Sequence, residues 1–435
     1  MLSLSTLYDL DILCPPHQQK ASLWDKLNYC QTAGGQQELK KILLLEEHSL
    51  EKTLARQQAI AYILAKAKEI VFPVKENEVF YLQHYMNSNY TIDHTTTKIM
   101  LAVKSYTKLI IAKGDYLYIL SAVKQALFII DQVKSAYEQL HSSTAPALLR
   151  DIFDTIETCL GKLQIKDAIN IQQHEPNPMM LYQADRQIRL EDRDAVDTLL
   201  AAYYQLEALS SLAKAHRDMQ LVFPEIGGRL TITGMRHPMV KHCHANNVAL
   251  NDEHTILVTG PNMAGKSTFL KSLGLTFIMA YTGIGVAAEY AQVPFLKQII
   301  TSILTEDDIG KGYSYFYTEV LRVKAIATAL RQQPSTLIIA DELFKGTNVK
   351  DANDCTETVV NGCLKQSNGL FIIATHLVET VQKFTGNNHC RLLCFEGTIA
   401  SGTIEFDYVL KEGVSVTRLG THIMEQEDIP ALFGL

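Results

Sequence analysis

Residues 260–268 read GPNMAGKST and follow the apolar run HTILVT of residues 254–259. The two glycines, the lysine and the serine fit the pattern GxxxxGK[ST], which leads from a strand through a glycine-rich loop into a helix. In such a loop the glycines let backbone N–H groups close around phosphates, and the helix N-terminus adds the positive end of its dipole. The sequence therefore predicts an α/β domain in which a buried strand ends in a phosphate-binding loop.

The side chains of this loop suit a nucleotide that carries a metal ion. We expect Lys266 to reach the β- and γ-phosphates of ATP as a point charge, and the Ser267 hydroxyl to ligate Mg²⁺. Contacts to ATP are predicted along the whole run, which consists of Gly260, Pro261, Asn262, Met263, Ala264, Gly265, Lys266, Ser267 and Thr268. ATP is thus the expected substrate and Mg²⁺ the expected cofactor.

Two later apolar runs end in groups that can act on a phosphate. The run TLIIA closes on Asp341 and Glu342. An acidic pair in this place is commonly just a solvated strand end. Behind a phosphate loop of the same domain, it predicts that Asp341 holds the magnesium shell and that Glu342 orients and deprotonates the attacking water. His376 ends the next run, FIIATH, and is predicted to sense the γ-phosphate or polarise the water, although a lone histidine is most often structural.

The two halves of the chain differ in the secondary structure that their patterns of apolar residues predict. Residues 1–222 read as helical almost throughout, with long helices predicted over 116–140 and 191–219 and breaks at HSSTAP and QHEPNP. Beyond them, the apolar runs HTILVT, LIIA and LFIIA alternate with helical stretches, which predicts a mainly parallel sheet that carries ligands at the carboxyl ends of its strands. We expect a helical domain over 1–222 and a P-loop ATPase domain over 223–435.

The composition is that of a globular protein with an acidic balance. Hydrophobic residues make up 47% and charged residues 20% of the 435 residues, and the net charge is −7. Nucleic acid would therefore have to meet a local basic patch or a partner subunit. Eight scattered cysteines without a CxxC pair suit a reducing cytosol. A zinc site at His389, Cys390 and Cys394, joined by residues 242–244, is disfavoured because the spacing fits no common zinc pattern.

No segment predicts a membrane anchor. The N-terminus lacks a basic region and carries two aspartates, unlike a signal peptide. The most apolar stretch, residues 273–288, is interrupted by two glycines and is too short to span a bilayer. We expect a cytoplasmic protein without membrane contact.

Taken together, the motifs resemble the ATPase domain of the MutS DNA mismatch-repair family. The segments RHP, NVAL and TGPNMAGKSTFLK come first, DIGKGYSYFYTE (308–319) follows, and DELFKGTN and ATHLVE complete the set in the family's order. The resemblance covers about residues 226–400 and implies an ABC-type nucleotide fold. The LSGGQ signature of membrane transporter subunits does not precede DELFKGTN.

The resemblance implies roles for further residues. Ser314 matches the serine that reaches the γ-phosphate bound by the other subunit, which implies a homodimer with composite ATP sites. Asn262 matches the asparagine that helps to place the attacking water. Asp308, Phe316 and Glu319 match structural positions of the same loop as Ser314.

The chain departs from the family pattern at several places. Ala264 stands where glycine is common, and Phe344 and Lys345 replace the usual Gly-Arg, which alters the subunit contact expected there. The aromatic residue that the family often stacks on adenine is replaced by the segment HCHANN, so that His242 or His244 is the candidate substitute.

The helical half resembles the family's core (lever) domain, which carries DNA-clamping helices. Only about 50 residues separate the two long predicted helices, so the clamp is expected to be reduced. We also expect the chain to start at the core domain, without the family's mismatch-reading and connector domains. Lysines that could line a channel in a dimer are candidate DNA contacts, although a solvated helix face is the more common explanation for such residues: Lys98, Lys104, Lys108, Lys113, Lys124 and Lys134.

The leading hypothesis is an ATP-dependent DNA-binding protein of the mismatch-repair type, which hydrolyses ATP in a dimer to drive clamp-like movements on DNA. The alternative is a MutS-family ATPase that acts on another client, such as recombination intermediates or ribosome-bound RNA, without mismatch recognition. Under the leading hypothesis, a second subunit or another protein would supply the recognition of mismatches.

Overall fold

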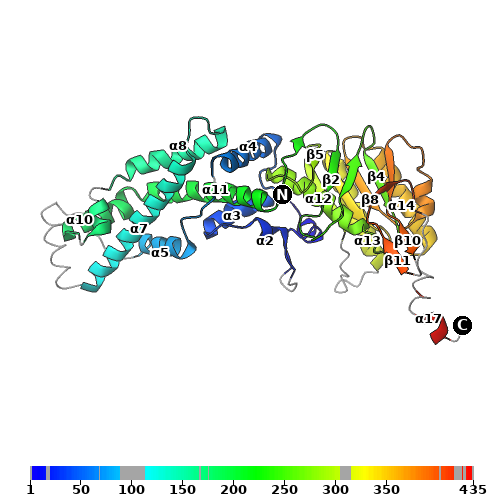
Figure 1. Cartoon of the computed structure of the whole chain (residues 1–435), viewed down its shortest axis with the longest axis horizontal. Coiled ribbons are helices and arrows are strands. Elements are labelled where there is room, and N and C mark those ends of the chain that lie inside the picture. Colours follow the sequence, from blue (N-terminus) through cyan, green and yellow to red (C-terminus); the bar gives the residue numbers. More distant parts are fainter. Residues whose placement is uncertain are drawn as a thin grey trace. The chain divides into compact units, whose positions relative to one another are not determined.

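The computed structural model describes residues 2–15, 20–67, 69–88, 113–165, 168–174, 176–303, 315–400, 403–415, 424 and 428–433. The chain divides into two compact units. The unit that we call the sheet unit comprises Met1–Lys26, Leu43–Leu54 and Asp218–Leu435, and the helical unit comprises Leu27–Ile42 and Ala55–Arg217. Figure 1 follows the chain through both.

In the first half of the chain, every regular element among the described residues is a helix. Its elements are α1 (Leu4–Asp9), α2 (Leu23–Leu27), α3 (Ala33–Leu43), α4 (Leu50–Lys66), α5 (Glu76–Met86), α7 (Lys113–Leu140), α8 (Ala147–Lys162), α9 (Ala168–Gln173), α10 (Pro178–Arg186), the π-helical turn η1 (Gln187–Glu191) and α11 (Arg193–Asp218).

The two long helices predicted in this half are α7 and α11, and the helical pattern of α11 identifies its buried face. Seven apolar residues at helical spacing are all buried, as the pattern requires: Val196, Leu199, Leu200, Tyr203, Leu206, Leu209 and Leu212. The break HSSTAP separates α7 from α8, and QHEPNP separates α9 from α10. Asn177 caps α10 by accepting a hydrogen bond from Met179 N at 2.9 Å.

Helix α7 is the one described helix that is long and apolar enough, by length and composition alone, to cross a membrane. The core helix of a globular protein passes the same test. Within the helical unit α7 packs against α5, α8, α9 and α10, so its apolar residues have protein neighbours. Of the lysines that are candidate DNA contacts, Lys113, Lys124 and Lys134 lie on α7, and Lys134 pairs with Glu138 at 3.7 Å. Lys98, Lys104 and Lys108 lie outside the described residues.

The second half of the chain alternates strands with helices. Its strands are β1 (Glu225–Ile226), β2 (Thr231–Met235), β3 (Asn246–Ala249), β4 (Thr255–Thr259), β5 (Tyr290–Val293), β6 (Gln298–Ser302), β7 (Thr336–Asp341), β8 (Leu370–Ala374), β9 (Cys390–Cys394), β10 (Gly397–Ala400), β11 (Thr403–Phe406) and β12 (Lys411–Glu412). Its helices are α12 (Lys266–Thr282), α13 (Tyr315–Gln332), α14 (Val349–Leu364), α15 (Val378–Gln382) and α17 (Ile429–Leu432).

The main sheet has the order β12-β9-β4-β8-β7-β6, and every pair in it is parallel except β12 with β9. The three strands predicted from continuous apolar runs, β4, β8 and β7, are neighbours at its centre. All residues of β4 and β8 are buried, which is why these strands are apolar on both faces. The predicted mix of helices with a mainly parallel sheet is confirmed. A smaller mixed sheet has the order β1-β5-β2-β3.

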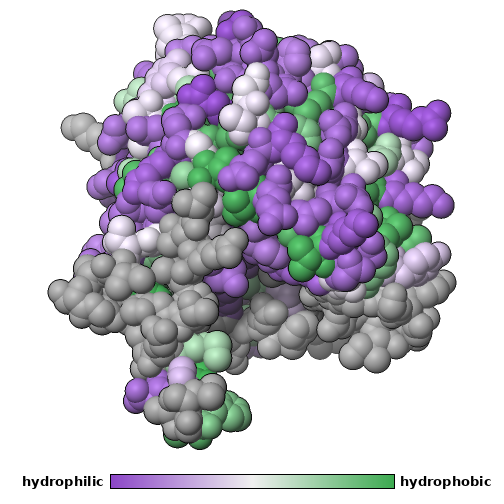
Figure 2. Space-filling view, turned by 90° about the vertical axis from the view of Figure 1, so that its right-hand side faces the viewer, coloured by the Kyte–Doolittle hydropathy of each residue, from purple (hydrophilic) through white to green (hydrophobic). Residues whose placement is uncertain are grey.

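Helices cover this central sheet. Helix α12 packs against β7 and β8 (Figure 1). Side chains of α13 and α14 join the same two strands in one apolar cluster. The outer face in Figure 2 is mostly hydrophilic, with apolar side chains in small separate patches. The apolar strands are thus buried inside, and only the ends of the strands and their loops can present groups to a ligand.

The N-terminal segment is part of the sheet unit. Asp9, at the end of α1, accepts hydrogen bonds from Thr301 Oγ1 at 2.7 Å and from Ile303 N at 3.1 Å, both at the end of β6. Asp11 forms an ion pair with Lys271 of α12 at 2.8 Å. Residues 1–26 therefore pack on the unit that carries the phosphate loop, while the division into domains at 222 and 223 stays a prediction.

Candidate active site

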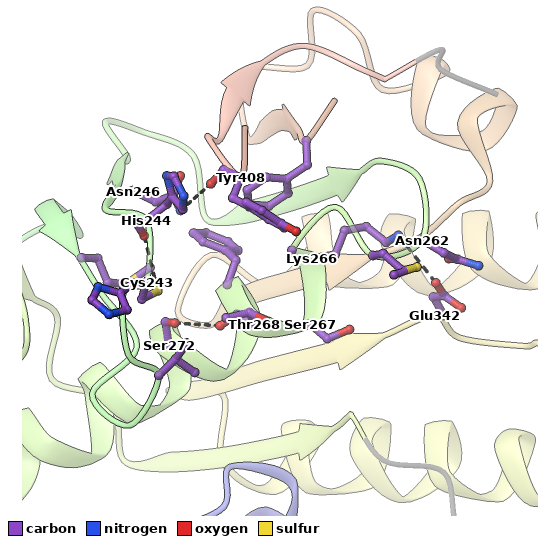
Figure 3. A pocket seen from close by; sticks show the side chains of 17 residues that line it. Cys243, His244, Asn246, Asn262, Lys266, Ser267, Thr268, Ser272, Glu342 and Tyr408 are labelled. Carbon is purple, nitrogen blue, oxygen red and sulfur yellow. Dashed lines mark hydrogen bonds and ion pairs between the residues drawn. The ribbon is translucent and has the colours of Figure 1, made fainter. Parts of the chain in front are cut away.

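A pocket of about 390 Å³ opens where β4 and β7 end, and Figure 3 shows the side chains that line it. This volume is in the range of pockets that hold small ligands. Seven of the predicted site residues line it: Asn262, Met263, Gly265, Lys266, Ser267, Thr268 and Glu342. The structure thus brings together the loop after β4 and the acidic residue after β7, which are some 75 residues apart in the sequence.

The backbone of the loop explains why glycine stands at its first position. Gly260 has φ +150°, and a Cβ atom there would lie 2.7 Å from the backbone oxygen of Phe395. Gly265 has φ +109° and caps the N-terminus of α12. Met263 adopts φ +68°, and its side chain lines the pocket although it is 80% exposed.

The Lys266 ammonium is held inside the loop. Its Nζ donates hydrogen bonds to the carbonyl oxygens of Gly260 at 2.8 Å and of Pro261 at 3.1 Å, and lies 3.8 Å from Glu342 Oε1. The side chain is only 5% exposed, and this burial lowers the pKa of Lys266 in spite of the carboxylates of Glu342 and Asp341 nearby. A buried ammonium in a loop of carbonyls is a cation that an anionic ligand can attract.

Ser267 and Asp341 meet at the floor of the site. Ser267 Oγ donates a hydrogen bond to Asp341 Oδ2 at 2.5 Å. The other carboxylate oxygen, Oδ1, is buried without a hydrogen-bond partner among the described residues. Burial raises the pKa of Asp341, while the bond from Ser267 opposes that rise. A buried oxygen without a partner costs free energy, so this pair fits a divalent cation as an additional partner.

The number of protein ligands at this position suits magnesium in particular. Mg²⁺ is commonly held by one or two protein oxygens together with waters and substrate phosphates, rather than by an all-protein cage. Over the described ranges, no group of three or more His, Cys, Asp or Glu side chains is arranged to hold a metal ion. The described residues His389, Cys390 and Cys394 therefore form no such group either.

Glu342 carries the carboxylate closest to the Lys266 ammonium. Its Oε2 lies 2.9 Å from Lys345 Nζ and 3.9 Å from His376 Nδ1. Burial by itself would raise the pKa of Glu342, but the hydrogen bond from Lys345 and the charges of Lys345, Lys266 and His376 outweigh it and hold the pKa below its ordinary value. His376 is 58% exposed and reaches the same carboxylate from the end of β8, as its place in the sequence predicts.

The far end of the pocket is aromatic: the sequence offered His242 and His244 as candidates to stack on adenine, but it did not indicate Tyr408 or Phe395. Tyr408 lies with its ring centroid 5.5 Å from that of His244, and Phe395 and His242 line the same pocket. Asn246 fixes the segment around Tyr408, because its Nδ2 donates to Tyr408 O at 3.2 Å and its Oδ1 accepts from Leu410 N at 2.7 Å (Figure 3). Tyr408 lies some 140 residues beyond the phosphate loop, and no local pattern marks it.

The segment expected to reach a partner subunit is only partly described. Ser314 and Asp308 lie outside the described residues. Phe316 and Glu319 belong to α13, where Phe316 contacts the ring of Phe344 with centroids 6.1 Å apart and the buried Glu319 binds the backbone after β7. Lys345, noted in the sequence only as a departure from a family pattern, is the closest cation to Glu342.

Comparison with known proteins agrees with this site. Residues 256–433 match the family model of MutS domain V. The chain is 27% identical over 282 residues to the DNA mismatch repair protein MutS of Geobacillus thermodenitrificans (strain NG80-2), over 62% of this chain and 31% of that protein. It is 30% identical over 246 residues to the protein of that name from Streptococcus uberis (strain ATCC BAA-854 / 0140J), over 54% and 29%.

A third such relative is the DNA mismatch repair protein MutS of Macrococcus caseolyticus (strain JCSC5402), with 30% identity over 272 residues that cover 58% of this chain and 31% of that protein. The chain spans about a third of the length of the curated relatives it matches. The domain V match includes the strand before the phosphate loop, the loop itself and the residues after β7 and β8. Residues 256–433 thus carry the domain V of the MutS family, and the chain is similar to these MutS proteins over 54–62% of its length.

Proposed function

We propose that the sheet unit binds ATP with Mg²⁺ and hydrolyses it to ADP and phosphate, as a P-loop ATPase of the ABC type. The observation that carries the proposal is the Ser267–Asp341 hydrogen bond, with a buried carboxylate oxygen left over, directly beside the Lys266 ammonium and the Glu342 carboxylate. They offer two ligands for a cation, an ammonium for the phosphates and a base. Lys266, Ser267 and Glu342 line one pocket, and Asp341 is bonded to Ser267.

The phosphate end of the pocket would work through the chain's own groups. Backbone N–H groups of the loop 260–268 and Lys266 would hold the phosphates, and Ser267 with Asp341 would hold the metal ion. Bound there, Mg²⁺ would neutralise charge on the phosphate oxygens. Glu342 would take a proton from the attacking water, His376 would orient the γ-phosphate or the water, and Asn262 would help to place the water.

The aromatic end of the pocket would hold the base. Tyr408 and His244 offer flat faces to a purine, and Asn246 keeps Tyr408 in place from β3. Of the two histidines predicted to stack on adenine, His244 is the one whose ring lies against Tyr408, so we propose that these two rings together form the base platform.

The similarity to MutS proteins supports proposals on the dimer, the localisation and the client. We propose a homodimer with composite ATP sites, in which Ser314 of one subunit completes the site of the other. We further propose that the protein is cytoplasmic, and that its core/lever domain (1–222) moves on DNA when the ATPase domains (223–435) close. A mixed-dimer assay tests the composite site: Ser314→Ala and Lys266→Ala chains are mixed before ATPase rates are measured. Activity that is the same in every pairing contradicts a role of Ser314 in the partner's site.

The client of the ATPase is tested by the rate of ATP hydrolysis without DNA and with homoduplex, mismatched and branched DNA. Stimulation by DNA supports the DNA-clamp proposal, and stimulation by mismatched DNA alone would show that this protein reads mismatches without another subunit. If no DNA changes the rate while ATP is hydrolysed, a different client, such as ribosome-bound RNA, becomes the better proposal. A wild-type protein that binds no ATP contradicts the proposal as a whole.

A further inference from the structure

The loop that follows β7 brings a second lysine onto the Glu342 carboxylate. Lys345 Nζ lies 2.9 Å from Glu342 Oε2, whereas Lys266 Nζ lies 3.8 Å from the other oxygen, Oε1. The bond from Lys345 is therefore the short, charge-assisted one. If Lys266 turns to a phosphate, Lys345 still holds the carboxylate through Oε2 and leaves Oε1 for a water.

The backbone of this loop is held in an unfavourable conformation. Glu342 has φ +51° and Phe344 has φ +63°. The left-handed region costs about 1–2 kcal/mol for a residue with a side chain, so other contacts must fix the loop. Phe344 provides one of them, because its side chain is buried in an apolar cluster with Ala352 and Leu377 and packs against Phe316.

Glu319 of α13 provides a second anchor for the loop. Its buried carboxylate accepts a hydrogen bond from Lys345 N and another from Gly346 N, each at 3.0 Å. A buried carboxylate is costly unless its oxygens are bonded, so both bonds fix the backbone from which the Lys345 side chain starts. Helix α13 begins at Tyr315, directly after Ser314. The place of Lys345 thus depends on the helix that follows the segment expected to reach a partner.

We propose that Lys345 is a positioning residue for ATP hydrolysis, which fixes the Glu342 carboxylate through Oε2 and is itself fixed by Glu319. The inference rests on the proposed function, because it concerns the base of that reaction. The proposal also explains why the strained loop is bound by the carboxylate of Glu319, which is buried and does not line the pocket. A movement of α13 would then shift the Glu342 carboxylate, because Glu319 binds the backbone of the loop and the Lys345 side chain binds Glu342.

The test separates ATP binding from turnover in the full-length protein. Lys345→Met removes the ammonium and keeps the length of the side chain, Lys345→Arg keeps the charge, and Lys350→Met is the matched control at an exposed lysine of α14. Lys345 is 40% exposed, so these changes are not expected to unfold the loop. ATP Kd is measured with a fluorescent analogue, kcat by phosphate release, and dimer formation by light scattering.

We expect Lys345→Met to lower kcat by about 10- to 100-fold, as for a misplaced catalytic group, with ATP Kd and dimer formation close to wild type. Lys345→Arg should recover most of the rate and Lys350→Met should match wild type. Glu319→Gln should also lower kcat, because Lys345 N and Gly346 N bind separate carboxylate oxygens and one of them would then face the amide NH2 group. Lys345→Gln serves as a second neutral variant if Lys345→Met is unstable.

Three results would overturn the inference. They are a kcat of Lys345→Met within threefold of wild type, a Lys345→Arg variant as slow as Lys345→Met, and a loss of rate that follows a loss of dimer or of ATP affinity. Glu342→Gln tells the two proposals apart. If wild type hydrolyses ATP, Glu342→Gln does not and Lys345→Met is at full rate, only the inference falls. If wild type does not hydrolyse ATP, the proposed function falls with it.

Discussion

Replacement of Gly260 by alanine should destabilise the sheet unit as well as the phosphate loop. The new Cβ would lie 2.7 Å from Phe395 O, a backbone atom that a rotamer change cannot move. Phe395 N in turn donates to Thr259 O at 2.9 Å, so the two backbones are tied together at the end of β4. We expect about 1–3 kcal/mol from the φ of +150° and about 1–3 kcal/mol more from the forced shift of a packed backbone.

Two other glycines are matched controls for the two contributions. Gly386 has φ +80° but open space around its Cβ position, so Gly386→Ala should show the backbone strain alone, about 1–2 kcal/mol. Gly362 lies in α14 with neither strain nor neighbours, so Gly362→Ala should stabilise the protein by about 0.5–1 kcal/mol. The difference between Gly260→Ala and Gly386→Ala then isolates the contact with Phe395.

The assay is thermal unfolding followed by the fluorescence of Trp24, the only tryptophan of the chain, which belongs to the sheet unit. For a unit of this size about 1 kcal/mol corresponds to roughly 2–4 °C in Tm. The contact with Phe395, at about 1–3 kcal/mol, should therefore lower the Tm of Gly260→Ala by roughly 2–12 °C relative to Gly386→Ala, and Gly260→Ala should not bind a fluorescent ATP analogue. Equal Tm values for these two variants would refute the argument from the Phe395 contact.

Two further predictions test the site, and a third concerns a buried histidine of the sheet unit. Glu342→Gln should lower kcat by about 10²- to 10⁴-fold. ATP binding should be kept or tightened, since Lys266 loses the carboxylate 3.8 Å away. Hydrolysis near the wild-type rate in a phosphate-release assay would exclude Glu342 as the base. Tyr408→Ala should weaken ATP binding by about 1–3 kcal/mol, whereas Tyr408→Phe should bind like wild type; equal Kd values for all three proteins would contradict the base platform. His237 is buried, which lowers its pKa to about 4, while an unfolded histidine titrates near 6.5. The unfolded chain takes up the proton first, so this contribution to stability is complete above about pH 6.5 and is lost between about pH 6.5 and 4; His237→Asn should flatten the Trp24-detected Tm over that interval, and an unchanged pH dependence would exclude His237 as its source.

The sequence alone determined the local features of this protein. A strand, a glycine loop and a helix start follow one another within residues 254–268, so the short-range pattern contains both the conformation and the chemistry of the loop. The same holds for the buried strands β7 and β8, whose apolar runs end on Glu342 and His376, and for the helices of the first half, whose breaks carry proline. Parallel strands share one carboxyl edge, and for this reason the sequence could also predict that these groups meet.

Only the tertiary structure decided which distant residues complete the site. Tyr408 reaches the phosphate loop because β3 and the segment before β12 are joined through Asn246, a contact across more than 160 residues that no periodicity encodes. Lys345 reaches Glu342 because a buried carboxylate on α13 fixes a strained turn. The N-terminal aspartates bind β6 and α12, although the first 222 residues read as one helical half. Such contacts depend on packing between elements, and each residue's local sequence is compatible with many other partners.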